Sequence, residues 1–126
     1  MIPLLKLSFE ASALTVGFRF ARFSDSAASS KVALAAANTD AIIGVFPALA
    51  TAIGDIAEVT VAGQEFIELG GTVTAGAPLT SDATGRAILA APVVSTTVRV
   101  GAIALELGVI GDRIKCLVVP SLLRTP

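Results

Sequence analysis

The acidic residues with matched spacing are Asp55 and Asp112, each of which ends an Ile-Gly-Asp tripeptide. Two such carboxylates could act as general acid and base, or bind a hard cation. Alternatively, each aspartate caps its own tight turn by accepting a backbone N–H. Because no further oxygen ligands are spaced near either tripeptide, the sequence favours structural turns at Gly54-Asp55 and Gly111-Asp112.

The other chemistry-bearing side chains are three glutamates and one cysteine. Glu58, Glu65 and Glu68 cluster near one predicted hairpin, and we expect all three to be solvated. Cys116 has no cationic residue spaced to stabilise a thiolate, so we expect it in the core. The chain has no histidine, which excludes imidazole catalysis and histidine metal sites, and one cysteine cannot form an internal disulfide. The sequence therefore predicts no enzyme, no cofactor and no bound metal.

Glycine-rich residues 70–76 have the composition of a phosphate-binding loop but not its spacing, since no Gly-Lys-Ser/Thr follows. We predict a turn, a short strand and another turn there. The next segment is typical of two short strands around a reversal from Asp82 to Gly85. Aspartate at the first position and glycine at the fourth position fit a type I turn.

Composition excludes further classes. With 9 Lys+Arg against 10 Asp+Glu and no basic cluster, we expect neither nucleic acid nor an anionic membrane surface as partner. The longest uncharged stretch, residues 41–54, is shorter than the roughly 20 residues of a spanning helix. Hydrophobic residues make up 54% and charged residues 15% of the chain, so much apolar surface must remain outside its own core. We therefore expect a soluble protein that associates with itself or with a protein partner.

Hydrophobic residues recur with a period of two in short runs separated by Gly, Pro, Asp and Ser. Phe18 and Phe20 flank Arg19, and Val98 and Val100 flank Arg99. This pattern predicts an all-β domain of short strands, such as a partly open barrel or a sandwich. At most one or two helical turns are expected, after Pro47.

An internal echo at an offset of 57 residues relates residues 41–63 to residues 98–120. Ile43-Gly44-Val45 falls on Val100-Gly101-Ala102, and the two Ile-Gly-Asp tripeptides coincide. Each copy is predicted to contain a strand with a glycine, a loop, a turn and a second strand. The inward face of the second strands gives the predicted core residues Val59, Val61, Ile114, Cys116 and Val118.

The chain is divided into an N-terminal segment (1–12), a single β domain (13–119) and a C-terminal tail (120–126). The first segment is strongly apolar and is expected to be either an additional strand of its own sheet or an arm that pairs with a neighbour. Its apolar residues are the predicted contacts with a partner protein or another subunit: Ile2, Leu4, Leu5, Leu7 and Phe9.

An ordered series of segments resembles one known family. The segments are residues 17–23 (GFRFARF), 39–45 (TDAIIGV), 54–63 (GDIAEVTVAG), 73–87 (VTAGAPLTSDATGRA), 99–106 (RVGAIALE) and 110–118 (IGDRIKCLV). Together they are similar to the capsid cement, or decoration, proteins of tailed bacteriophages, over roughly residues 13–119. Residues 1–12 lie outside the resemblance.

This resemblance implies a small β-tulip domain that decorates and stabilises the outer surface of an expanded phage capsid. Its partners would be the major capsid protein and other copies of itself, as a homotrimer or alternatively a dimer. The protein would be made in the bacterial host cytoplasm and reside in the virion, and the family has no catalytic residues to transfer.

A second resemblance leads to the alternative function. Residues 71–79 also look like the half-barrel turns of biotinyl and lipoyl carriers and of related carbohydrate-binding β domains. A carrier needs a lysine at a hairpin tip, whereas the tips here hold Asp55, Asp82 and Asp112. The alternative is therefore a minor tail or fibre protein or a carbohydrate-binding β module, although sugar sites usually use Trp or Tyr and the chain has neither.

Overall fold

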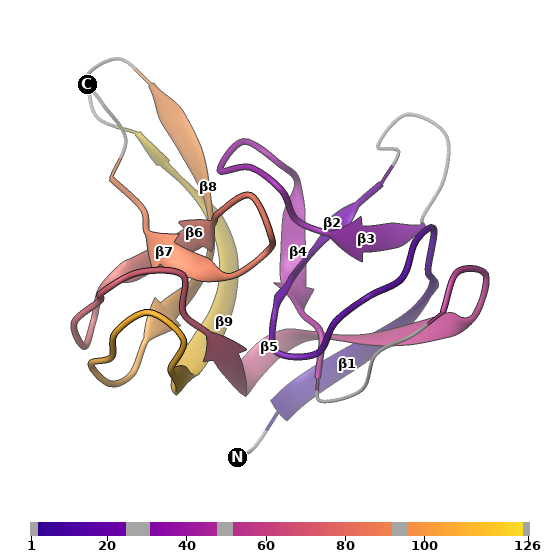
Figure 1. The fold of residues 1–126 in the computed structure, drawn as a ribbon, viewed down its shortest axis with the longest axis horizontal. Helices are drawn as coiled ribbons and strands as arrows, with labels where there is room; N and C mark the ends of the chain where they lie inside the picture. Colours follow the sequence, from indigo (N-terminus) through magenta and orange to yellow (C-terminus); the bar gives the residue numbers. More distant parts are fainter. Residues whose placement is uncertain (1–2, 25–30, 48–51, 92–95, 125–126) are drawn as a thin grey trace.

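The computed structural model describes residues 3–24, 31–47, 52–91 and 96–124. The regular structure of these residues is entirely β, as predicted, and Figure 1 shows the strands curling around two centres. The helical turns expected after Pro47 fall mainly on residues 48–51, outside the described residues. The strands are β1 (Pro3–Glu10), β2 (Phe20–Phe23), β3 (Val32–Leu34), β4 (Ile42–Val45), β5 (Ile56–Glu68), β6 (Pro78–Ser81), β7 (Ala87–Leu89), β8 (Thr97–Ala104) and β9 (Arg113–Arg124).

The strands form one antiparallel sheet in the order β3-β2-β4-β5-β9-β8-β6-β7, with β1 also paired to β5. The long strand β5 connects the two parts of this sheet. Its first part pairs with β1, from Glu10↔Ile56 to Pro3↔Gly63, and its second part pairs with β9 from Gly63 to Glu68. Gly63 has a φ of 94°, so the strand departs from regular geometry where its partner changes.

Two equivalent sets of five strands make up the fold and share β5. The first set has the order β3-β2-β4-β5-β1, and the second has the order β7-β6-β8-β9-β5. The second part of β5 therefore takes, in the second set, the place that β1 takes in the first. The predicted echo of residues 41–63 and 98–120 falls on β4–β5 and β8–β9, and the structural repeat extends beyond it to every strand. The offset of 57 relates Thr60 to Leu117, but the strand pairing relates Val45 to Ile103, because the register of β8 shifts between Val100 and Ala102.

The same type of contact curls each set into a partly open barrel. Ala11, which follows β1, forms a parallel bridge with Val32 of β3, and Leu69, which follows β5, forms a parallel bridge with Ala87 of β7. The next residue adds a backbone hydrogen bond in both places: Ser12 N–H donates to the Val32 carbonyl (2.9 Å), and Gly70 N–H donates to the Ala87 carbonyl (2.8 Å). The two sets of strands therefore share the contact that curls each of them into a partly open barrel, as well as the order in which their strands pair.

The interior consists of two main hydrophobic clusters that share strands of the first set. Phe20 and Ile42 belong to the cluster that also contains Cys116 and Val118. Ala21, the next residue of β2, belongs to the cluster around Val59. Because β2 and β4 contribute one face to each cluster, the two barrels form a single packed unit. Of the predicted core residues, Val59, Ile114, Cys116 and Val118 are buried, and Val61 is half-buried against the second of these clusters.

The structure corrects the predicted C-terminal tail, and for residues 1–12 it agrees with one of the two alternatives, the additional strand. Residues 120–124 are not a tail, because β9 continues to Arg124 and pairs with β8 from Thr97 onward. Pro120 lacks an N–H, and it is accommodated because this part of β9 has only β8 as a strand partner among the described residues. The segment 1–12 contains β1, which belongs to the sheet of its own chain.

Candidate functional site

The two Ile-Gly-Asp turns have the same backbone geometry. Gly54 and Gly111 have φ values of 84° and 88°, a conformation that glycine adopts readily. Each turn is tied by two backbone hydrogen bonds to a single residue, which is Ala11 after β1 in the first set and Leu69 after β5 in the second. These bonds are Gly54 N–H to Ala11 O (2.8 Å), Gly111 N–H to Leu69 O (2.9 Å), Ala11 N–H to Asp55 O (2.9 Å) and Leu69 N–H to Asp112 O (2.7 Å).

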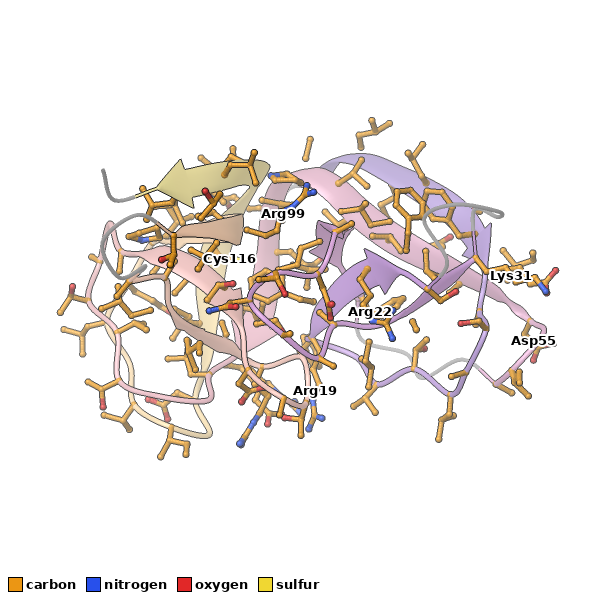
Figure 2. All side chains as sticks on the ribbon, turned by 90° about the horizontal axis from the view of Figure 1, so that it is seen from above. Arg19, Arg22, Lys31, Asp55, Arg99 and Cys116 are labelled. Atoms are coloured by element: carbon orange, nitrogen blue, oxygen red, sulfur yellow. The ribbon has the colours of Figure 1, made fainter. Side chains whose placement is uncertain are left out.

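Asp55 and Asp112 occupy these turns and are not brought together. Both residues are exposed, and Asp112 Oδ2 accepts the Val109 N–H at 3.0 Å. The two turns lie toward opposite ends of the molecule, with Asp55 at the right-hand end in Figure 2 and the β8–β9 loop at the lower left of Figure 1. The arrangement provides no shared cation site and no acid–base pair.

Asp82 and Gly85 form the predicted reversal between β6 and β7. Asp82 Oδ1 accepts hydrogen bonds from the backbone N–H groups of Thr84 (2.8 Å) and Arg86 (2.9 Å). Gly85 has a φ of 85°. The carboxylate therefore organises its own turn, a structural role for a residue at a hairpin tip.

A network of ion pairs, which sequence analysis missed, surrounds this reversal. Glu68 at the end of β5 pairs with Arg19 (3.6 Å) and with Arg86 (3.8 Å), and Arg86 also pairs with Asp82 (3.4 Å). Arg19 donates a further hydrogen bond to the Thr84 carbonyl at 3.1 Å. The network joins the start of β2 to the β6–β7 turn, so it links the two barrels. In the sequence, Arg19 stood out because it alternates with Phe18 and Phe20. Alternation along one segment could not indicate that Glu68, far away in the sequence, would be its ion-pair partner.

Glu65 was expected in solvent, and the structure shows that this was wrong. Its side chain is buried at 6% exposure, where Oε2 accepts the Thr60 hydroxyl (2.9 Å) and Oε1 accepts the Phe66 N–H (3.1 Å). Glu65 lies directly opposite Cys116 in the β5–β9 pairing. Glu58 is exposed as expected, whereas Glu68 is largely buried in the ion-pair network.

Cys116 is a buried, free thiol. Burial, reinforced by the negative charge of Glu65, raises the pKa of Cys116 from its usual value of 9.0 to about 12. Nucleophilic reactivity requires the thiolate, which is therefore scarce at neutral pH. The geometry makes Cys116 a core residue and gives it no catalytic role.

The predicted contact residues of the N-terminal segment lie on or next to β1: Ile2, Leu4, Leu5, Leu7 and Phe9. Ile2 falls outside the described residues, and the side chain of Leu4 is likewise not described. Leu5 and Leu7 are 49% and 42% exposed, so both are accessible to a partner. Phe9 instead packs inward, with an edge-to-face contact to Phe23 at 5.7 Å between ring centroids.

A second group of exposed apolar residues lies in the β8–β9 loop, and sequence analysis did not single it out. Its members, which are 41% to 75% exposed, are Leu105, Leu107, Val109 and Ile110. The sequence predicted the turn at Gly111-Asp112. No hydrophobic pattern in the loop indicated whether its apolar side chains would be buried or exposed. Ile53, in the equivalent turn of the first set, is also exposed.

The described residues contain no group of three or more Asp, Glu or Cys side chains arranged to hold a metal ion. They also include no helix long and apolar enough to cross a membrane. The features that the site offers a partner are exposed apolar side chains on loops and on β1.

Fold and surface together define an all-β protein of two fused, partly open barrels. The chain matches no protein-family model and no curated protein. Its fold is similar to the crystal structure of the head fiber gp8.5 N base in bacteriophage phi29, with a TM-score of 0.67 and 20% sequence identity. The likeness covers 95% of this chain and 98% of that chain.

Proposed function

We propose that this chain is a structural protein of a phage virion that decorates and stabilises the outer surface of the capsid through protein–protein contacts. The observation that carries the proposal is the fold likeness to a phage head fiber base over nearly the whole of both chains. The resemblance of six ordered segments to capsid cement proteins supports the same class of function.

The chemistry of the described residues agrees with a binding role. The carboxylates Asp55, Asp82 and Asp112 belong to turns, and the thiol of Cys116 is buried. The surface, in contrast, exposes large apolar side chains in several places, including 75% of Leu107 and 72% of Ile53. Exposed apolar groups of this kind gain free energy when a protein partner covers them.

A second candidate is the base of a fibre that projects from the head. The structural neighbour favours it, because that protein is a phage head fiber base. A cement protein and a fibre base differ in copy number and in mechanical effect. The first is expected on most capsomers and strengthens the shell, whereas the second attaches a projecting appendage.

Quantitative mass spectrometry of purified, DNA-filled particles from the source tests the proposal. A ratio of this chain to the major capsid protein near one to one, with loss of shell robustness when mild chaotrope removes the chain, is the expected result. A few copies per particle would support the fibre base or a minor tail protein. Absence from the particles would contradict a virion role and favour the carbohydrate-binding module.

The proposed contacts of β1 can be tested separately. The double substitution Leu5→Ser and Leu7→Ser removes exposed apolar surface and leaves Phe9 in its packed position. We expect weaker capsid binding or loss of homotrimer, with little change in the free energy of unfolding because both side chains are accessible. Sedimentation with particles and light scattering of the free protein measure these two properties. Unchanged values for both would remove β1 from the interface.

A further inference from the structure

The two Ile-Gly-Asp turns present the same side chain to solvent at equivalent places in the duplicated fold. Ile53 is 72% exposed and Ile110 is 62% exposed. The backbone that carries them is also equivalent, because Gly54 and Gly111 have nearly equal φ values and donate to Ala11, after β1, and to Leu69, after β5. We call these two turns, residues 53–55 and 110–112, the tips.

The fold explains two residues of each tip and leaves the third unexplained. Glycine is favoured by its positive φ, and the backbone of the aspartate accepts a hydrogen bond that fixes the turn. The isoleucine side chain belongs to neither hydrophobic core and lies mainly in water, where a polar residue would serve the turn equally well. Isoleucine at both tips is therefore better explained by contact with a partner than by folding.

Each tip has further exposed apolar side chains beside it along the chain. Ile56, at the start of β5, is 66% exposed, and Val109 and Leu107, before the second tip, are 52% and 75% exposed. The β4–β5 and β8–β9 loops that carry the tips lie toward opposite ends of the molecule (Figure 1), and Asp55 of the first tip marks one end in Figure 2. The molecule thus has two similar apolar projections, separated along its length.

We infer that the tips are two equivalent docking points through which one molecule binds two neighbouring copies of the same protein surface. The inference rests on the proposed function, which makes that surface an apolar recess of the major capsid protein. Equivalent contact elements fit equivalent recesses, and a shell of repeated subunits presents one recess many times. A molecule that binds two copies at once connects them, and the linkage multiplies the two affinities.

The test uses the full chain and DNA-filled particles of the encoding phage assembled without it. The variants are Ile53→Ser, Ile110→Ser and the double variant, with Leu89→Ser as a matched control, since Leu89 is 49% exposed on β7 and far from both tips in sequence. Each single variant is expected to weaken binding by a similar factor, about 10²-fold or more because avidity is lost. The double variant is expected to abolish binding, and the control to bind like the wild type.

Four outcomes would overturn the inference. One single variant binding like the wild type would show that the tips are not equivalent, and normal binding by all variants would show that the tips are not used. Loss of self-association by the variants, measured by light scattering of the free protein, would assign the tips to a second copy of this chain. In these three cases the proposed function stands, whereas failure of the wild type to bind particles would overturn the proposed function as well.

Discussion

Phe18 and Gly76 hold the same place in the two sets of strands. Both have positive φ, 63° and 86°, and their N–H groups donate to equivalent carbonyls, those of Phe46 (2.8 Å) and Ala104 (2.7 Å). An L side chain in this conformation costs about 1–2 kcal/mol. The ring of Phe18 lies under the guanidinium of Arg113, 4.4 Å from its centroid, and this contact offsets about 0.5–1 kcal/mol. The two sets of strands therefore have the same backbone conformation at this place, although one has phenylalanine there and the other has glycine.

Gly76→Ala is expected to lower the free energy of unfolding by about 1–2 kcal/mol. A Cβ at this position would meet no atom within 4 Å, so backbone strain is the sole cause. Urea unfolding measures the change. Gly71→Ala is the matched control, because its Cβ would lie 3.7 Å from Ile88 Cγ2 without strain in φ. Equal losses in both variants would contradict the explanation by strain.

Sequence patterns predicted the strands and turns well because each rests on a local physical requirement. Alternation identified the β strands, and the Ile-Gly-Asp turns disclosed the echo because positive φ retains glycine at Gly54 and Gly111. The repeat of β2–β3 in β6–β7 escaped detection, since these strands have three or four residues each. The two pairs of strands are equivalent in how they pair and in backbone conformation, as at Phe18 and Gly76. Neither property requires the same residue types, so the sequence shows no repeat there.

The candidate site was harder to predict because charge and alternation conflicted on β5. Alternation places Glu65 on the same face as Val59, while its charge predicts solvent. The structure follows alternation, and the buried carboxylate is satisfied by the hydroxyl of Thr60, which lies across the irregularity at Gly63. A hydrogen-bond partner that depends on such a bend cannot be inferred from spacing along a regular strand.

Gly101→Ala is expected to cost about 1–3 kcal/mol through overpacking. A Cβ on Gly101 would overlap Cε1 of Phe20, a fully buried ring, and approach Cγ2 of Ile42 to 2.8 Å. The double variant with Phe20→Leu should be less destabilised than the sum of its single variants, because the smaller side chain relieves the overlap. Thermal and urea unfolding of the four proteins measure this coupling. Strict additivity would contradict the proposed contact.

Raising the pH above 9 is expected to destabilise the protein through Cys116. The folded state holds the thiol proton up to a pKa of about 12, whereas the unfolded chain releases it near 9.0. The unfolded state therefore binds fewer protons in this window, and stability falls by up to about 1.4 kcal/mol per pH unit. Cys116→Val, which copies Val59 in the echo, should fall less steeply between pH 9 and pH 12. Parallel stability curves for the two proteins would contradict the raised pKa.

Glu65 provides a test in which the charge and the hydrogen bond of one side chain are separated. Glu65→Gln can satisfy both partners, since its amide oxygen can accept the Phe66 N–H while its NH2 donates to the Thr60 hydroxyl oxygen, and it removes the charge that raises the pKa of Cys116. We expect nearly unchanged stability and a pKa of Cys116 below about 12 but above 9.0, since burial is the larger cause. Ultraviolet absorbance of the thiolate reports this pKa without interference, because the chain has no tyrosine.

Glu65→Leu is the matched variant that also removes the acceptor. It leaves the buried Thr60 hydroxyl without its partner, which is expected to cost about 1–3 kcal/mol. Adding Thr60→Val should recover part of that loss, because it removes the buried hydroxyl that Glu65→Leu leaves without its acceptor. A Leu variant as stable as the Gln variant would mean that Thr60 finds another acceptor, and an unchanged pKa of Cys116 in the Gln variant would mean that the charge of Glu65 does not reach the thiol.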